Sequence, residues 1–382
     1  MPPSITTAIS MDLLRGALEL EPTAHGLLPH RLPGWARAQC ADPQLAMVES
    51  QPAGCRLVFR TRSTVIELDT LRTRPAYRGV PMRPDGVYDL LIDGRLAAQA
   101  TSTGGNVLLK DAATGAEELL PGEAGTIRFA DLPDHHKSVE IWLPHNETIE
   151  LIALRSDHPL DAAPSTRRTW LHHGSSISHG SNAVHPTGTW PALAAAAADV
   201  ELINLGMGGA ALLDPFTART MRDIPADLIS IKIGINVVNA DLMRLRAFGP
   251  AVHGFLDTLR DGHPTTPIVV VSALYCPIHE DTPGPLAPDF SSGTMIFVAT
   301  GDPAETRAGK LTLSVIRREL AAIVERRSAV DPHLRYLDGL RLYGPDDFAE
   351  LPLADNVHPG PQVHDRVGER FAGTIREIFT GD

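Results

Sequence analysis

Residues that could carry out nucleophilic catalysis lie in two distant stretches of the sequence. Ser176 belongs to the stretch WLHHGSSISHGSNA (170–183), directly after a run typical of a β-strand, and Asp355 and His358 stand close together near the C-terminal end. A serine hydroxyl can attack a carbonyl carbon, a histidine can accept its proton, and an aspartate can orient and stabilise the imidazolium. The three residues therefore indicate acyl transfer through an acyl-serine. A helix-capping serine and a solvated Asp-His turn are the alternatives.

Two further segments could supply N–H groups that stabilise a negatively charged oxygen. The segment NLGMGG (204–209) follows one predicted strand, and GIN (234–236) follows another. A glycine N–H and an asparagine side-chain amide from these segments would then join the N–H of the nucleophile in an oxyanion hole. The glycines could instead only permit a tight turn, and Asn236 could cap a helix.

Strands and helices alternate after residue 168, which predicts an α/β fold. The predicted strands are 168–173, 200–205, 227–233, 267–273 and 334–339, and the predicted helices are 188–199, 211–222, 239–262, 308–327 and 362–379. Five strands joined by helical crossovers predict a doubly wound, flavodoxin-like parallel sheet. Ligands bind at the carboxyl ends of the strands in such a sheet, and the candidate residues follow those ends.

The N-terminal part of the chain has a different pattern. Residues 50–158 contain short β-branched runs separated by turn signals such as Asp93-Gly94, with no helix-length period. This pattern predicts an all-β sandwich or jelly roll. We therefore expect two domains, a β-sandwich resembling a carbohydrate-binding module over 1–162 and an α/β catalytic domain over 163–382.

One connection in the second half is unusually long. Residues 276–305 contain five prolines and show neither a helical nor a strand period. A connection of this length usually acts as a lid or a binding loop. We expect it to lie near the substrate.

Composition and charge argue against several functional classes. The net charge of −12 disfavours nucleic acids and anionic membranes as partners. No window approaches the ~20 apolar residues that a membrane helix needs, and the first residues lack the pattern of a signal peptide, so a cytoplasmic location is expected. Three scattered cysteines argue against a disulfide framework, and Cys276 is expected to fill the core.

Histidines near Ser176 raise the question of a metal site. They are His172, His173, His179 and His185. Adjacent residues of a strand point to opposite faces, and no cysteine or carboxylate completes a ligand set with metal spacing. We therefore expect no metal and no cofactor. His179 could line the pocket, but we favour a position at the surface.

In these segments the sequence resembles the SGNH (or GDSL) hydrolases, over roughly residues 168–382. Its stretches Gly174-Ser175-Ser176-Ile177, Asn204 to Gly209, Gly234-Ile235-Asn236-Val237 and Asp355-x-x-His358 are similar, in order, to the four blocks of that family. The resemblance implies that Ser176 is the nucleophile, His358 the base and Asp355 the orienting acid. It also implies that Gly209 and Asn236 join Ser176 as oxyanion donors.

Two positions depart from the family pattern. Ser175 and Val237 stand where the family usually has aspartate. Neither position belongs to the triad, so the mechanism should survive. We expect the two changes to make the rim of the pocket less acidic.

The resemblance implies acyl-serine chemistry on small molecules and leaves the acceptor open. We favour an intracellular O-acyltransferase that moves an acyl group from a thioester, with acyl-CoA as co-substrate, to a hydroxyl of a natural product such as a polyketide. The alternatives are an esterase or deacetylase of the same fold and a carbohydrate-binding protein with a degenerate hydrolase domain. The sequence leaves the oligomeric state open.

Overall fold

The computed structural model describes residues 4–111, 114–291 and 295–381. The chain forms two compact units, which we call the β unit (Met1–Arg37, Ala46–Thr166 and Val184–Thr187) and the α/β unit (Ala38–Leu45, Arg167–Ala183 and Gly188–Asp382). The domain boundary between residues 162 and 163 stays a prediction. Among the described residues, no helix is long and apolar enough to cross a membrane.

The β unit contains two sheets. The first has eight strands in the order β10 (Glu117–Leu120), β9 (Asn106–Lys110), β6 (Ile66–Tyr77), β13 (Thr148–Ser156), β4 (Leu27–His30) and β3 (Glu19–Pro22), with β1 (Ile5–Thr7) beside β13 and β11 (Gly125–Phe129) beside β6. The second has six strands, β14 (Asp161–Ala162), β5 (Arg56–Thr61), β12 (Lys137–Trp142), β7 (Val87–Ile92) and β8 (Arg95–Thr101), with β2 (Leu14–Arg15) beside β5. Two short helices, α1 (Gly34–Arg37) and α2 (Pro43–Glu49), precede β5.

Alternating side chains of both sheets meet in one buried cluster, as in a β-sandwich. Leu57 and Ile141 come from the second sheet, and Leu68 and Leu151 come from the first. The predicted β-sandwich is thereby confirmed. The hairpin turn predicted at Asp93-Gly94 joins β7 to β8, and both of its residues have positive φ angles, 48° and 76°.

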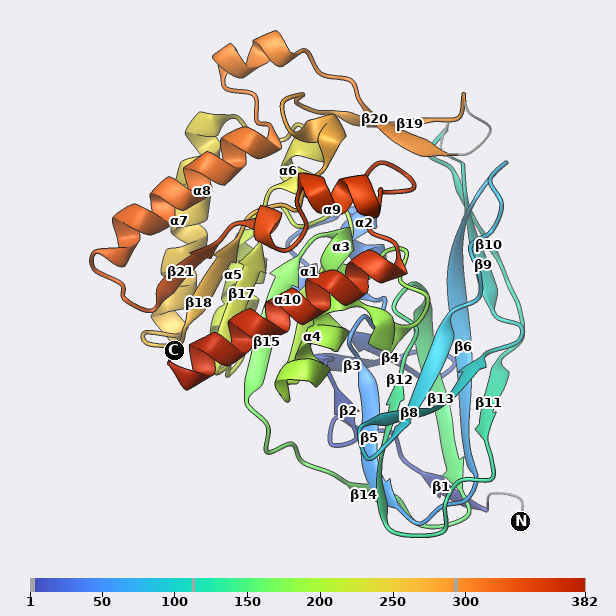
Figure 1. Ribbon diagram of the computed structural model, residues 1–382. Coiled ribbons are helices and arrows are strands. Elements are labelled where there is room, and N and C mark those ends of the chain that lie inside the picture. The colour runs from blue at the N-terminus through green and yellow to red at the C-terminus, as the bar shows by residue number, and fades with distance from the viewer. Residues whose placement is uncertain (1–3, 112–113, 292–294, 382) are drawn as a thin grey trace. The chain divides into compact units, whose positions relative to one another are not determined.

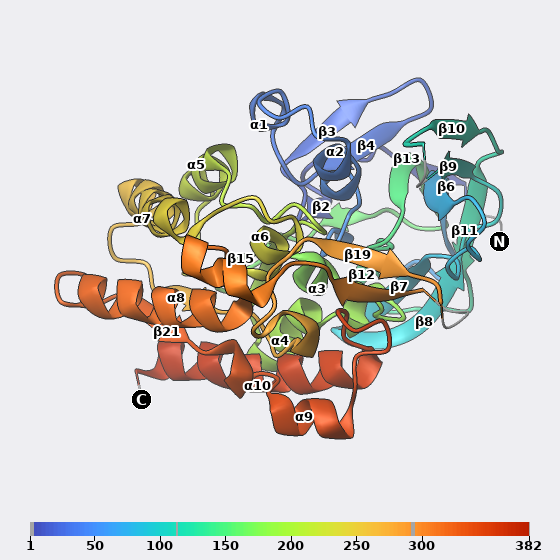
Figure 2. The ribbon, with the colours of Figure 1, turned by 90° about the horizontal axis from the view of Figure 1, so that it is seen from above.

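The α/β unit is built on a five-stranded parallel sheet, as predicted. Its strand order is β16 (Glu201–Gly206), β15 (Thr169–Gly174), β17 (Leu228–Lys232), β18 (Ile268–Val271) and β21 (Leu334–Leu337). Helices α4 (Trp190–Ala198) and α10 (Pro361–Thr380) cover one face, and α5 (Pro215–Asp223), α7 (Leu245–Gly262) and α8 (Leu313–Ser328) cover the other (Figures 1 and 2). This is the doubly wound, flavodoxin-like arrangement.

The helix predicted over 239–262 begins later in the structure, and only its first predicted residue belongs to a separate short helix. Helix α6 (Ile235–Asn239) ends before Asp241, whose φ of 49° interrupts the helical path, and α7 begins at Leu245. Further short helices were not predicted: α3 (Ser176–His179), α9 (Pro345–Glu350) and the 3-10 turns η1 (Pro186–Gly188) and η4 (Gly339–Arg341). They are too short to show a helical period in the sequence.

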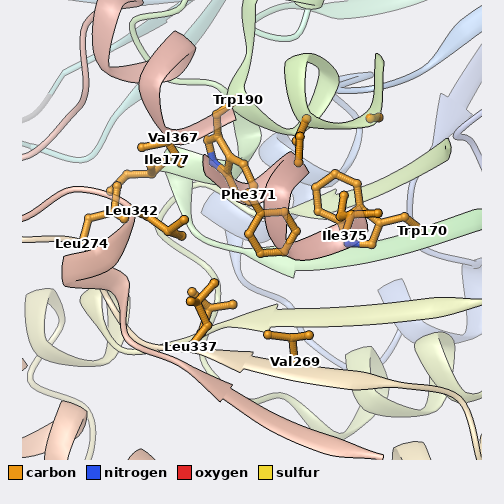
Figure 3. Close-up of a cluster of buried hydrophobic side chains, with 14 of the residues drawn as sticks. Trp170, Ile177, Trp190, Val269, Leu274, Leu337, Leu342, Val367, Phe371 and Ile375 are labelled. Atoms are coloured by element: carbon orange, nitrogen blue, oxygen red, sulfur yellow. The ribbon is translucent and has the colours of Figure 1, made fainter. Parts of the chain in front are cut away.

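A large apolar cluster of the α/β unit lies between the sheet and the pair α4 and α10 (Figure 3). Trp170 of β15, Trp190 of α4 and Phe371 of α10 are fully buried there, and the rings of Trp170 and Phe371 stack at 5.0 Å. Helix α10 contributes Val363, Val367, Phe371 and Ile375, the apolar stripe of its amphipathic sequence. This packing fixes the segment that precedes α10, which carries Asp355 and His358.

The long connection after β18 contains regular structure that the sequence did not predict. It holds η2 (Pro277–His279), an antiparallel hairpin of β19 (Leu286–Asp289) and β20 (Ile296–Ala299), and η3 (Pro303–Ala308). We call these two strands the β19–β20 hairpin.

Candidate active site

Ser176, His358 and Asp355 form a continuous chain of hydrogen bonds. The Oγ of Ser176 lies 2.9 Å from Nε2 of His358, and Nδ1 of His358 lies 2.8 Å from Oδ2 of Asp355. Both distances lie in the range of a hydrogen bond, and the order of atoms is that of a nucleophile, a base and an orienting acid. The structure therefore brings together three residues that are far apart in the sequence.

The Asp355 carboxylate is held ionised by its own loop. Its Oδ1 accepts hydrogen bonds from the backbone N–H groups of Val357 (3.0 Å) and His358 (2.7 Å). Burial alone would raise the pKa of Asp355. The hydrogen bonds and charge of His358, together with the backbone hydrogen bonds, outweigh burial and lower this pKa to about 2. The aspartate is therefore an anion at neutral pH and can stabilise an imidazolium.

The nucleophile stands at the start of α3, directly after β15. Ser175, not Ser176, caps this helix, because the Oγ of Ser175 accepts the N–H of Ile177 at 3.4 Å. The hydroxyl of Ser176 is thereby left for His358. Gly174 is needed at the turn, since a Cβ there would clash with the side chain of Ser178.

The three predicted oxyanion donors follow different strands of the sheet. Asn236 lies within α6, and its Oδ1 accepts the N–H of Ala211 at 3.1 Å, so that Nδ2 is the free end of the amide. Gly209 follows β16 with φ +74° and an exposed backbone. Among the described residues, no hydrogen-bond acceptor lies on the backbone N–H of Gly209 or of Ser176.

The expected effect of Ser175 and Val237 on the pocket rim is wrong. Ser175 is 1% exposed and Val237 is fully buried. Ser175 serves as the helix cap, and Val237 packs in the interior of the α/β unit. Neither side chain reaches a pocket rim, so their departures from the family pattern leave the charge of the rim unchanged.

The histidines near Ser176 are structural side chains. His172 and His173 point to opposite faces of the sheet, as predicted: the ring nitrogens of His172 bond Ser230 and Ser178, whereas His173 stacks on Phe255. His179 was expected at the surface but is 5% exposed, with Nδ1 3.2 Å from the Gly206 carbonyl oxygen. No group of side chains in the described ranges has the composition and geometry of a metal site.

Other residues contact the triad without having been assigned to it from the sequence. Asn182 donates to Oδ2 of Asp355 at 3.5 Å, and Phe297 of β20 meets the ring of His358 edge to face, with 5.9 Å between centroids. The Phe297 N–H donates to the Asp355 carbonyl (3.0 Å), and the Asn356 side chain donates to the Phe297 carbonyl (3.0 Å). Asn182 lies within the stretch around Ser176, and Phe297 lies within the connection 276–305 that was expected near the substrate.

Cys276 is buried, as predicted, and contributes to the same loop. Its Sγ donates to the Asn356 carbonyl at 3.3 Å, and burial raises the pKa of its thiol to about 12. The thiol is therefore protonated at neutral pH and is not a second nucleophile. It lines a small cavity with Ile177, Tyr343 and Val357.

Comparisons with known proteins show which sequences and folds the chain is similar to. The model of the GDSL-like lipase/acylhydrolase family matches residues 168–277. Salicylyl-acyltransferase SsfX3, from a tetracycline biosynthetic pathway, is 28% identical, with a TM-score of 0.76 over 94% of this chain and 92% of that one. No curated protein sequence matches the chain.

Two further solved structures share the fold at lower identity. A GDSL-like lipase from Bacteroides ovatus is 20% identical, with a TM-score of 0.68 over 96% of both chains. A family two carbohydrate esterase from Clostridium thermocellum is 12% identical, with a TM-score of 0.57 over 85% of this chain and 92% of that one. The family match over residues 168–277 and the similarity to the acyltransferase support an enzyme of the SGNH/GDSL type.

Proposed function

We propose that the chain is a serine O-acyltransferase that transfers an acyl group from a thioester to a hydroxyl of a small natural product. The observation that carries the acyl-serine chemistry is the hydrogen-bonded chain from Ser176 through His358 to Asp355. The preference for acyl transfer over hydrolysis is supported by the similarity to a salicylyl-acyltransferase over almost the full length of both chains. A cytoplasmic location and an acyl-CoA donor belong to the same proposal.

In the first half of the proposed reaction, Ser176 Oγ attacks the thioester carbonyl as His358 Nε2 takes its proton. The carbonyl π electrons move onto oxygen, and the backbone N–H groups of Ser176 and Gly209 and the Asn236 amide stabilise that charge. When the C–S bond breaks, His358 returns the proton to the departing thiolate. An acyl-Ser176 ester and a free thiol result.

In the second half, the acceptor hydroxyl gives its proton to His358 and its oxygen attacks the acyl-Ser176 carbonyl. The bond to Ser176 Oγ breaks, and Oγ recovers the proton from His358. The product is an ester, and the enzyme returns to its starting state. Water in place of the alcohol would give the free acid, which is the esterase reaction.

The β19–β20 hairpin supports transfer over hydrolysis because it covers the base. Phe297 lies edge to face against the His358 ring. An apolar ring at this position restricts the approach of water to the imidazole, while a bound alcohol held in attack geometry gains a large effective molarity.

The test is the ratio of ester to free acid formed from acyl thioesters with and without candidate alcohols. The wild-type enzyme should form ester with at least one alcohol, and Ser176→Ala should form neither product. Phe297→Ala should lower the ratio of ester to acid. Its matched control is Phe290→Ala, because Phe290 is near the same hairpin but 52% exposed. If no alcohol competes with water, the transferase proposal is wrong and an esterase remains.

A further inference from the structure

A side chain from the N-terminal part of the sequence bonds the peptide that carries one proposed oxyanion donor. The segment 38–45 belongs to the α/β unit. Within it, Nε2 of Gln44 donates to the Gly208 carbonyl at 2.8 Å. A Cβ built on Gly209 would lie 3.3 Å from that nitrogen, so the Gln44 amide rests directly on the Gly208–Gly209 peptide.

The local sequence fixes where Gln44 stands. Asp42 caps the start of α2, because its Oδ1 accepts the N–H of Leu45 at 2.7 Å, and Pro43 occupies the first helical position. Asp-Pro at these two positions is a strong signal for the beginning of a helix. Gln44 is therefore held in the first turn of α2.

The bond to Gly208 determines the direction of the Gly209 N–H. In a trans peptide the C=O of one residue and the N–H of the next point in opposite directions. A donor on the Gly208 carbonyl therefore directs the Gly209 N–H away from Gln44. That N–H is the one proposed to stabilise the oxyanion.

The local backbone alone does not fix this orientation of the Gly208–Gly209 peptide. Residues 207–210 form a turn closed by the bond from Ala210 N to Met207 O (3.1 Å), and φ of Gly209 is +74°, as in a type II turn. Types I and II differ by a flip of the central peptide, which here joins two glycines, and glycine adopts both signs of φ readily. An external hydrogen bond is thus needed to select one orientation.

We propose that Gln44 is a positioning residue that holds the Gly209 N–H in the orientation required for the oxyanion hole. The inference rests on the proposed function, because it assigns the held N–H a role in acyl transfer. It also predicts that a carboxylate at position 44 would reverse the orientation of the Gly208–Gly209 peptide. The carboxylate would repel the Gly208 carbonyl and attract the Gly209 N–H of the flipped peptide.

The kinetic test uses two near-isosteric variants and one matched control. Gln44→Met removes the donor and should lower kcat by about twofold to tenfold, the range for one neutral hydrogen bond. Gln44→Glu favours the flipped peptide and should lower kcat by roughly 10- to 100-fold, with KM within about twofold of the wild type in both variants. Gln39→Met is the control, because Gln39 lies on the same segment and its Oε1 accepts a hydrogen bond from Arg219 of α5.

A second measurement reports the orientation of the Gly208–Gly209 peptide without relying on turnover. The sequence contains two Gly-Gly pairs, Gly104-Gly105 and Gly208-Gly209. Protein labelled with [1-13C,15N]glycine therefore gives two carbonyl-to-amide cross-peaks, and the pair at 104–105 is an internal reference. The cross-peak of Gly208-Gly209 should move in Gln44→Met, and move further in Gln44→Glu, while the reference and the Gln39→Met spectrum stay unchanged.

The outcomes separate the two proposals. Turnover that survives in Ser176→Ala overturns the proposed function, whatever the glycine spectrum shows. A Gly208-Gly209 cross-peak that is unaffected by both Gln44 variants overturns the positioning of this peptide. A moved cross-peak with unchanged kcat, a change in KM alone, or equal losses in Gln44→Met and Gln39→Met overturns its role in the oxyanion hole.

Discussion

Replacement of Asn236 by aspartate replaces the Nδ2 donor and keeps the Oδ1 acceptor, which is already hydrogen-bonded within the protein. Oδ1 of Asn236 accepts the N–H of Ala211 at 3.1 Å, and Nδ2 is the end left for substrate. Aspartate is almost isosteric and keeps the bond to Ala211, but it replaces the donor by an oxygen anion. Asn236→Ala instead removes both the donor and the bond to Ala211.

The two variants distinguish catalysis from structure because the two interactions differ in size. Loss of one comparable oxyanion donor costs about 3 kcal/mol, which is about a 100-fold fall in kcat, and the anion at position 236 adds repulsion to that loss. The bond to Ala211 is a neutral hydrogen bond worth about 1 kcal/mol. Asn236→Asp should therefore lose at least as much kcat as Asn236→Ala, with little change in KM.

Hydrolysis of a chromogenic short-chain ester gives kcat and KM for both variants, and thermal unfolding gives their stability. A structural role for Asn236 gives the opposite order, with Asn236→Asp close to the wild type and Asn236→Ala defective. Asn236→Asp that keeps more than about a third of the wild-type kcat would refute the assignment of Nδ2 to the oxyanion hole.

Three further predictions concern the triad and its surroundings. Ser176→Ala should lower kcat/KM by roughly 10³-fold or more, measured with the same ester. Addition of EDTA should leave the rate unchanged, and inhibition that a divalent metal reverses would contradict the absence of a metal requirement. The pKa of Asp355, lowered from 3.8 to about 2, contributes about 2 kcal/mol of stability above pH 4 that is lost as pH falls toward 2. Urea unfolding should therefore show the gap between the wild type and Asp355→Asn shrinking from pH 6 to pH 3; a constant gap contradicts the lowered pKa.

The parallel sheet was predictable because short runs with buried apolar residues alternate with segments of helical length. The β15 strand is an example, since Trp170 and Leu171 are fully buried and Gly174 ends the strand. The break between α6 and α7 was not predictable, because neither glycine nor proline marks it and Asp241 takes the positive φ instead. Short elements such as α3 depend on caps rather than on a period.

The residues of the candidate site likewise include some that the sequence predicts and some that it does not. Ser176, Asp355 and His358 were predictable because their residue types fit nucleophilic catalysis and the resemblance to the family's sequence blocks assigned each its role. Gln44 was not, since a single side chain that donates to a carbonyl leaves no periodic pattern and its partner Gly208 is distant in the sequence. The burial of Val237 was missed because the family pattern suggested a polar position.

The β19–β20 hairpin and the loop that carries the base share backbone hydrogen bonds. Phe297 N–H donates to the Asp355 carbonyl, and the Asn356 side chain donates to the Phe297 carbonyl. A displacement of β20 must therefore stretch these bonds or move the backbone of Asp355, whose carboxylate orients His358. Deletion of the hairpin would alter the cover over the imidazole and the position of the base together. Phe297→Ala removes only the ring and leaves both backbone hydrogen bonds possible. If the ratio of ester to acid then falls while the acylation rate stays unchanged, the ring acts by excluding water and not by positioning the base.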